Sequence, residues 1–124
     1  MSWQVDHLVV GAATLEQGAA WCAATLGVLP GPGGKHPLMG THNLLLAIGA
    51  AAYPRSYLEI IAVDPKAPPP ARRRWFDLDD PALRAALAAG PRLIHWVARC
   101  DDVAGDCAAL AAAGIERGEV LAAE

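Results

Sequence analysis

Hydrophobic and polar positions alternate along much of the first half of the chain, as they do in half-buried strands. This pattern predicts four strands, over residues 3–10, 36–39, 43–48 and 57–63. Thr14 and Gln17 form a capping box that begins a helix, and Gly27 supplies the C-terminal cap that ends it. The glycine-rich stretch at 30–37 is predicted to be mainly a loop. The first half of the chain is therefore expected to form a β-α-β-β-β unit.

The second half opens with a proline-rich connector, residues 64–74, which is expected to be extended. Asp80 and Pro81 then begin a short helix that Gly90 ends. After this helix, RLIHWVARCDDVAGDCAALAAAGI repeats the layout of QVDHLVVGAATLEQGAAWCAATLGV. Each copy has a strand with a central histidine, a polar cap, an alanine-rich helix with one cysteine, and a closing glycine. Two such units indicate an internal duplication.

The duplication divides the chain into a first module (residues 1–64), a connector with a short helix (65–91) and a partial second module (92–124). The second module is expected to continue into one more strand at 115–120. It has no counterpart to the last two strands of the first module, so exposed sheet edges would remain. Either a partner chain covers these edges, or the polypeptide is a piece of a longer one.

Composition and charge narrow the classes of function. The 124 residues are enough for one domain, and a net charge of -3 without a basic stripe argues against a nucleic-acid partner. No apolar run is long enough to span a bilayer, and the N-terminus lacks the features of a secretory signal. The three cysteines have no C-x-x-C spacing. We therefore expect reduced thiols, a cytoplasmic protein and no cysteine zinc site.

One acidic residue, Glu59, stands in the middle of the apolar strand YLEII, where an unpaired buried carboxylate would be costly. His7 and His95 occupy the centres of the two repeated strands, and each is the one strong ligand among mainly apolar neighbours on its face. Two imidazoles and one carboxylate suit Fe(II), Mn(II), Zn(II) or Ni(II). The alternatives are hydrogen-bonded histidines and a Glu59 side chain that faces solvent.

Two further histidines, His36 and His42, lie in the segment GKHPLMGTHNLL, in or near a predicted turn. Histidines in such places are commonly just exposed. The turn could instead aim His42 or Asn43 into a cleft, as a substrate contact or a proton shuttle. Trp75 and Phe76 are expected to anchor the connector to the core, or else to form an aromatic lid.

Four segments together resemble the glyoxalase-like domains of the vicinal oxygen chelate superfamily: DHLVVGAATLEQGAAW, GGKHPLMGTHNLLLAIG, YLEIIAVDP and RLIHWVAR. The resemblance extends over about residues 3–120. It implies an α+β fold of paired βαβββ modules with curled mixed sheets, the second module apparently incomplete, that enclose a metal or ligand cleft. It also implies that His7, Glu59 and His95 are metal ligands, and that a fourth ligand belongs to a last strand beyond Glu124.

Two functions follow from the resemblance. The first is a metalloenzyme in which a divalent metal (Zn, Ni, Mn or Fe) chelates two neighbouring oxygens of a small substrate, for lyase or isomerase chemistry in preference to dioxygenase chemistry. Glu59 or His42 would then transfer protons. The second is a metal-free, drug-sequestering module that works as a homodimer, with or without exchange of strands or modules. In either case the expected substrate contacts are Trp3, His36, Asn43, Tyr57 and Trp96.

Overall fold

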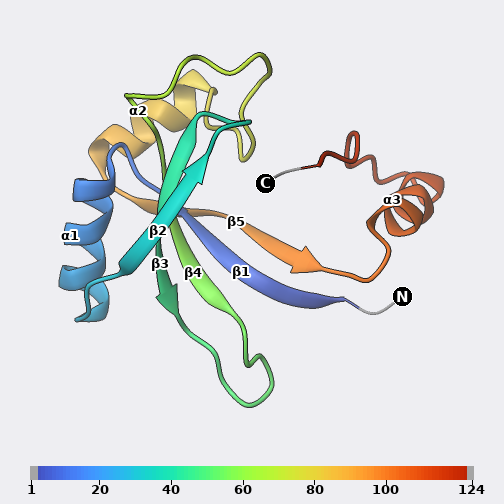
Figure 1. Cartoon of the computed structure of the whole chain (residues 1–124), viewed down its shortest axis with the longest axis horizontal. Helices are drawn as coiled ribbons and strands as arrows, with labels where there is room; N and C mark the ends of the chain where they lie inside the picture. The colour runs from blue at the N-terminus through green and yellow to red at the C-terminus, as the bar shows by residue number, and fades with distance from the viewer. Residues whose placement is uncertain (1–2, 123–124) are drawn as a thin grey trace.

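The computed structural model describes residues 3–122 and confirms the α+β class (Figure 1). The elements in chain order are β1 (Gln4–Gly11), α1 (Leu15–Leu26), β2 (Gly31–His36), β3 (Thr41–Ala47), β4 (Tyr57–Val63), α2 (Pro81–Ala89), β5 (Arg92–Arg99) and α3 (Val103–Ala112). The first module is thus a β-α-β-β-β unit, as predicted. The ends of the predicted modules, residues 1–2 and 123–124, lie outside the described residues.

All five strands form one open mixed sheet in the order β2-β3-β4-β1-β5, which is not closed into a barrel. The central strands β1 and β4 are parallel, and every other neighbouring pair is antiparallel. Because β1 pairs with β4 on one side and β5 on the other, the first strand of the second repeat joins the sheet of the first. Whether residues 1–64, 65–91 and 92–124 are separate units stays a prediction.

Helix α1 covers one face of this sheet. Its predicted capping box is present, since the Gln17 N–H donates to Thr14 Oγ1 at 3.0 Å, and Gly27 ends the helix with a left-handed φ of 75°. Cys22 of α1 and Ile60 of β4 are fully buried in the core of this face. Gly18 allows the close approach, because a Cβ at this position would collide with Ile60.

The opposite face of the sheet is covered at one end by the connector and α2. Its core joins Val9 and Ile61 of the central strands to Leu78 and Leu87. Helix α2 begins as predicted, with Asp80 accepting the Ala82 N–H at 2.9 Å and proline in the first turn. We refer to this surface as the connector face and to the opposite one as the α1 face.

Two predicted strands are wrong. Residues 37–39 of the strand expected at 36–39 lie in a turn, and the glycine-rich stretch, expected to be a loop, forms β2, which ends at His36. This strand is stabilised by its pairing with β3, and glycine is needed there because a Cβ at Gly33 would collide with Asn43. The strand expected at 115–120 is absent, since no neighbouring strand pairs with it. This segment instead contributes Glu119 to an ion pair with Arg72.

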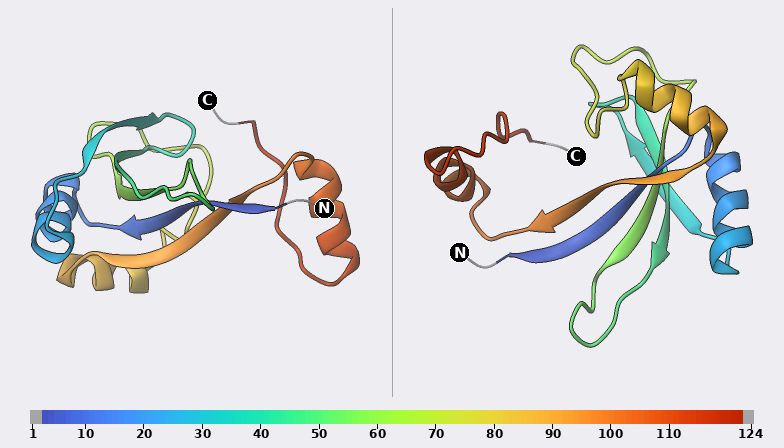
Figure 2. Two further views of the ribbon diagram at one scale, coloured as in Figure 1. Left: turned by 90° about the horizontal axis from the view of Figure 1, so that it is seen from below. Right: turned by 180° about the vertical axis from the view of Figure 1, so that it is seen from behind.

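Helix α3 stands away from the sheet, as two further views show (Figure 2). None of its residues is buried. Its N-cap is nevertheless formed as predicted, because Asp102 accepts the Gly105 N–H at 3.0 Å. No helix within residues 3–122 is both long and apolar enough to cross a membrane.

Candidate functional site

The candidate site lies around Glu59 on the connector face. Glu59 of β4 is paired in register with Val9 of β1 and Leu45 of β3, and its side chain is 6% exposed. Its Oε1 lies 3.3 Å from His7 Nε2, and its Oε2 accepts a hydrogen bond of 2.6 Å from the Asn43 amide. The alternative of a solvent-facing Glu59 is therefore excluded, because the carboxylate is buried and has partners on both oxygens.

His36 approaches the same carboxylate from β2. Its Nε2 lies 3.7 Å from Glu59 Oε2, and its Nδ1 lies 2.9 Å from the Thr41 hydroxyl. Asn43 is held in place by a second bond, since its Oδ1 accepts the Gly34 N–H at 2.8 Å. Three predicted contacts, His36, Asn43 and Tyr57, thus lie around the His7–Glu59 pair. Their roles toward a substrate stay predictions.

Asp6 and Tyr57 orient His7. Asp6 Oδ2 lies 2.7 Å from His7 Nδ1, and the Tyr57 ring is stacked on the imidazole with centroids 4.5 Å apart. Sequence reasoning missed Asp6, because consecutive strand residues normally point to opposite faces. The β1–β5 register shifts between Val5 and His7, and this irregularity accompanies the contact. The only signal in the sequence is that an acid precedes a candidate ligand histidine.

The electrostatics of this cluster couple His7 to the two carboxylates. Burial alone would lower the pKa of His7, but its hydrogen bonds with Glu59 and Asp6 outweigh burial and raise the pKa above its usual value. Burial opposes ionisation of Glu59, yet the bonds from His7 and Asn43 hold its pKa below the usual range. Without a metal, these two residues therefore favour an imidazolium–carboxylate pair.

The other two shifts in this cluster come mainly from burial. Burial lowers the pKa of His36 despite the nearby Glu59 charge, so the neutral imidazole is favoured at neutral pH. Burial, reinforced by the charges of Asp6 and Glu59, raises the pKa of Tyr57 to about 12. Tyr57 is consequently a neutral neighbour of His7 throughout the physiological range.

His95 lies on the same face but is not in the cluster. His95 of β5 is paired with Val9 of β1, and Val9 is paired on its other side with Glu59 of β4. Strand β1 therefore separates His95 from Glu59. The His95 ring contacts Phe76 at a centroid distance of 5.2 Å, and its Nδ1 accepts the Trp96 backbone N–H at 3.1 Å. Within residues 3–122, no three His, Cys, Asp or Glu side chains form a group that could hold a metal ion.

Two aromatic residues of the connector cover the site. Trp75 contacts His36 edge to face at 5.2 Å, Phe76 contacts His95, and the two aromatic rings stack on each other at 5.3 Å. Phe76 and Asp77 have φ values of 56° and 58°, a left-handed conformation that is uncommon for such residues. The Trp75 indole N–H is buried and has no hydrogen-bond partner among the described residues. A donor without a partner is therefore present in the cover of the site.

Three predicted site residues lie elsewhere. His42 and Trp96 belong to the α1 face, since each is one residue removed along its strand from a residue on the connector face. The prediction treated GTHN as a turn, but Thr41, His42 and Asn43 are consecutive residues of β3, so His42 and Asn43 point in opposite directions. Trp3 is partly exposed and donates its indole N–H to Asp106 of α3 at 2.7 Å.

The residues present fit part of a metal centre. His7 Nε2 and a Glu59 oxygen face each other, and the His7 Nδ1–Asp6 contact is the arrangement that orients histidine ligands in proteins. His7 and Glu59 are therefore a suitable pair of ligands. His36 and His95 are the nearest further histidines on this face, and neither completes a set of three in this conformation.

The comparisons with known proteins agree with this architecture. The family described as "Glyoxalase-like domain" matches residues 5–123. No curated protein matches this chain. Among solved structures, a variant of Streptomyces coelicolor methylmalonyl-CoA epimerase in complex with 2-nitronate-propionyl-CoA superposes with a TM-score of 0.59. The two sequences are 22% identical, over 90% of this chain and 71% of that chain.

Two other solved structures are similar. Methylmalonyl-CoA epimerase from Mycobacterium tuberculosis has 20% identity and a TM-score of 0.56, over 89% of this chain and 63% of that chain. A hypothetical protein from Bacillus halodurans C-125 has 13% identity and a TM-score of 0.61, over 92% and 70% of the two chains. Identities this low establish a common fold only.

Proposed function

Because this chain belongs to the glyoxalase-like domain family of the vicinal oxygen chelate superfamily, we propose that it is a metal-dependent isomerase or lyase acting on a small substrate with two neighbouring oxygens. The observation that carries the proposal is the buried Glu59 carboxylate, 3.3 Å from the Nε2 of a histidine whose other nitrogen contacts Asp6. A fold of this size could bury an apolar residue at position 59 at lower cost. A ligand role explains why the position holds an acid.

His7 and Glu59 would hold the metal. A bound divalent cation supplies Lewis-acid stabilisation of negative charge on a substrate oxygen. Because a histidine must be neutral to bind a metal, His7 has to release its second proton on metal binding. Asp6 then keeps the remaining proton on Nδ1 and leaves Nε2 free as the ligand atom. Asn43 holds the Glu59 carboxylate in a fixed orientation through its 2.6 Å bond.

His36 is the residue best placed to move a proton. Its imidazole adjoins Glu59 and is fixed by the Thr41 hydroxyl, and its pKa is lowered by burial, so it can accept a proton at neutral pH. Trp75 packs edge to face against the His36 imidazole and shields that side of the ring. The unpartnered indole N–H of Trp75 is available to donate to a substrate oxygen.

The first substrates to test are acyl-coenzyme A esters that carry a free carboxylate on the carbon next to the thioester, and the hemithioacetals that 2-oxo aldehydes form with a thiol. Both present two neighbouring oxygens and an acidic C–H bond. The similar structure from Streptomyces coelicolor holds a coenzyme A ester, which supports the first class. The proton of the C–H bond would pass to the His36 imidazole and then return to the carbon. While it is on the imidazole, it would exchange with solvent.

The test is solvent-deuterium incorporation at that carbon, followed by NMR in the presence of each candidate metal. We expect metal-dependent exchange in the wild type, and a loss of exchange in His36→Gln with metal content retained. Asp106→Asn is the control, because this hydrogen-bonded carboxylate of α3 lies outside the site. Metal-independent exchange, or full exchange in His36→Gln, would contradict these roles.

The second candidate function is metal-free binding of a small apolar molecule. A cavity of about 230 Å³ lies beside the site and is lined mainly by apolar and aromatic side chains, among them Val5, Leu8, Tyr53 and Tyr57. Such a lining suits a small hydrophobic ligand. Saturable binding of a hydrophobic probe to protein stripped of metal, unchanged when metal is added, would favour this function over the enzyme.

We also propose that a second copy of the chain is the partner, with or without exchange of strands. The outer edge of β5 has no neighbouring strand among the described residues, and Leu93 and Trp96 of this strand are 62% and 57% exposed. Sheet edges and exposed apolar side chains of this kind favour association. Light scattering of the purified protein distinguishes a dimer from a monomer.

A further inference from the structure

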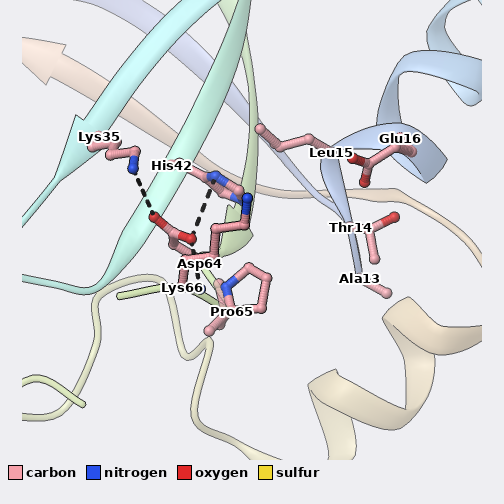
Figure 3. A pocket seen from close by; sticks show the side chains of 10 residues that line it. Ala13, Thr14, Leu15, Glu16, Lys35, His42, Asp64, Pro65 and Lys66 are labelled. Atoms are coloured by element: carbon pink, nitrogen blue, oxygen red, sulfur yellow. Dashed lines mark hydrogen bonds and ion pairs between the residues drawn. The ribbon is translucent and has the colours of Figure 1, made fainter. Parts of the chain in front are cut away.

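A second cavity, which is polar, lies on the opposite side of the sheet from Glu59. Its volume is about 330 Å³, and it lies between the N-terminal end of α1 and the ends of β3 and β4 (Figure 3). Its chemistry-bearing side chains are those of Thr14, Glu16, Lys35, His42, Asp64 and Lys66. This cavity contains His42, which sequence reasoning had assigned to the Glu59 site.

Asp64 organises the cavity. Its side chain is 5% exposed, and its Oδ1 accepts the Lys66 backbone N–H at 2.9 Å. The same Oδ1 lies 3.9 Å from His42 Nδ1, and Oδ2 lies 4.0 Å from the Lys35 ammonium. The hydrogen bond from the Lys66 N–H lowers the pKa of Asp64, and burial opposes this shift. The nearby His42 and Lys35 lower it further, so the pKa lies below its usual range. The buried carboxylate is thus ionised and already surrounded by donors.

The remaining polar groups favour an anionic ligand. His42 Nδ1 lies toward Asp64, so Nε2 is the nitrogen left to face the cavity. A bound anion would favour the imidazolium form, in which both ring nitrogens donate. The Lys35 side chain is 71% exposed, so its ammonium is accessible from solvent. The first turn of α1 adds backbone N–H groups and the positive end of the helix dipole. Glu16 is the one other carboxylate of the lining, and it opposes an anion.

We propose that this cavity binds the phosphate group of a small molecule, with Lys35 and Lys66 as its charged donors and His42 as a further contact. Donors converging from β3, β2 and the segment after β4 match the several oxygens of a phosphate better than the two of a carboxylate. The cavity is larger than a phosphate ion and leaves room for an ester group. The site is independent of the function proposed for Glu59, because the sheet separates the two.

The experiment is a titration followed by backbone and imidazole NMR signals, with inorganic phosphate, glycerol phosphate and acetate as separate probes and sodium chloride at matched ionic strength. We expect saturable shifts at Leu15, Lys66 and His42 with both phosphate compounds, and much weaker ones with acetate. Tighter binding of glycerol phosphate than of inorganic phosphate identifies an ester as the ligand class, and the reverse order identifies the free ion.

Variants test the donors. His42→Asn is expected to weaken phosphate binding about tenfold, as for loss of a charge-assisted hydrogen bond. Lys35→Ala is expected to weaken it up to about fivefold, and Glu16→Gln to strengthen it by a similar factor. Arg73→Ala, which removes an exposed cation outside the cavity, is the matched control. Lys35 is exposed, so its variant remains informative if His42→Asn perturbs folding.

Two results would overturn the proposal. One is shifts that sodium chloride reproduces at equal ionic strength. The other is a phosphate affinity that Lys35→Ala and Glu16→Gln change no more than Arg73→Ala does.

Discussion

The two repeated units of the chain have nearly the same sequence layout but different environments. In the first unit, α1 packs against β3 and β4, and Cys22 is fully buried. In the second unit, α3 follows β5 with a comparable cap and helix, yet it buries no residue, and Cys107 remains partly exposed. The first helix has a sheet face to cover, whereas the second follows a single edge strand.

The difference shows what a repeated pattern determines. Caps and helix-forming residues specify a helix locally, so both helices form where they were expected. Burial requires a surface of matching apolar residues, and only the first unit supplies one, from Val10, Leu58 and Ile60. Tertiary packing, not helix propensity, supplies most of the stability of a helix in a protein. The following variants test this comparison.

Truncation of the apolar contacts of the two helices should give the largest difference. Ile60→Ala removes a fully buried side chain beneath α1 and should reduce the free energy of unfolding by about 3 kcal/mol. Leu110→Ala in α3 should cost less than about 1 kcal/mol, because Leu110 is only partly buried. Urea denaturation followed by circular dichroism measures both. Equal losses would show that α3 is packed as firmly as α1.

The two cysteines offer a smaller, closely matched test. Cys22→Ser places a hydroxyl in an apolar core and should cost about 1–3 kcal/mol. Cys107→Ser, in the helix of the second unit, should change stability by less than about 0.5 kcal/mol. Thiol labelling provides an independent measure, since the Cys107 thiol should react with a maleimide much faster than the buried Cys22. Similar stability losses and similar labelling rates would contradict the comparison.

Acidification should reveal a still smaller difference in stability, which depends on Asp79 in the connector between the two units. The hydrogen bond from the Arg74 backbone N–H holds the pKa of Asp79 below its usual value, although burial opposes this shift. The Arg74 guanidinium lowers the pKa further. A carboxylate with a lowered folded-state pKa stabilises the fold above its unfolded-state pKa, about 4, and this contribution is lost as the pH falls through the folded-state value.

Wild type should therefore be more stable than Asp79→Asn at pH 6, by up to about 1 kcal/mol, and the gap should close below pH 4. Urea denaturation between pH 2 and pH 6 measures the gap. A difference that stays constant across this range would show that ionisation of Asp79 has no part in holding the connector.

Much of the fold could be predicted from the sequence because its signals are local. The capping box of α1, the Asp80–Pro81 helix start and the alternation in β4 each identify an element without reference to the rest of the chain. Strand β2 could not be predicted in this way, since its glycines carry no strand signal and it depends on pairing with β3. The segment 115–120 was expected to be a strand from its local pattern, but it has no strand to pair with among the described residues and therefore does not form one.

The candidate site could be predicted only in part. Alternation groups His7 with Val9 along β1, and Glu59 with Tyr57 along β4, because period-two geometry is a property of each strand. That the two groups share one face follows from the pairing of β1 with β4, and before the structure only the family resemblance brought them together. His42 and Asn43 were assigned to one cleft because the start of β3 was placed two residues too late, at residue 43 instead of Thr41. Asp6 reaches His7 through a register irregularity that no single strand reveals. The positions of His36 and His95 relative to Glu59 likewise depend on strand pairing.

The most direct test of the central claim is the metal content of wild type, Glu59→Gln and Asp106→Asn after reconstitution with Zn, Ni, Mn or Fe, by elemental mass spectrometry. We predict stoichiometric metal in wild type and Asp106→Asn, and affinity reduced by more than about tenfold in Glu59→Gln. Absence of metal from the wild type with all four ions, or equal binding by Glu59→Gln, would contradict the assignment of Glu59 and His7 as ligands.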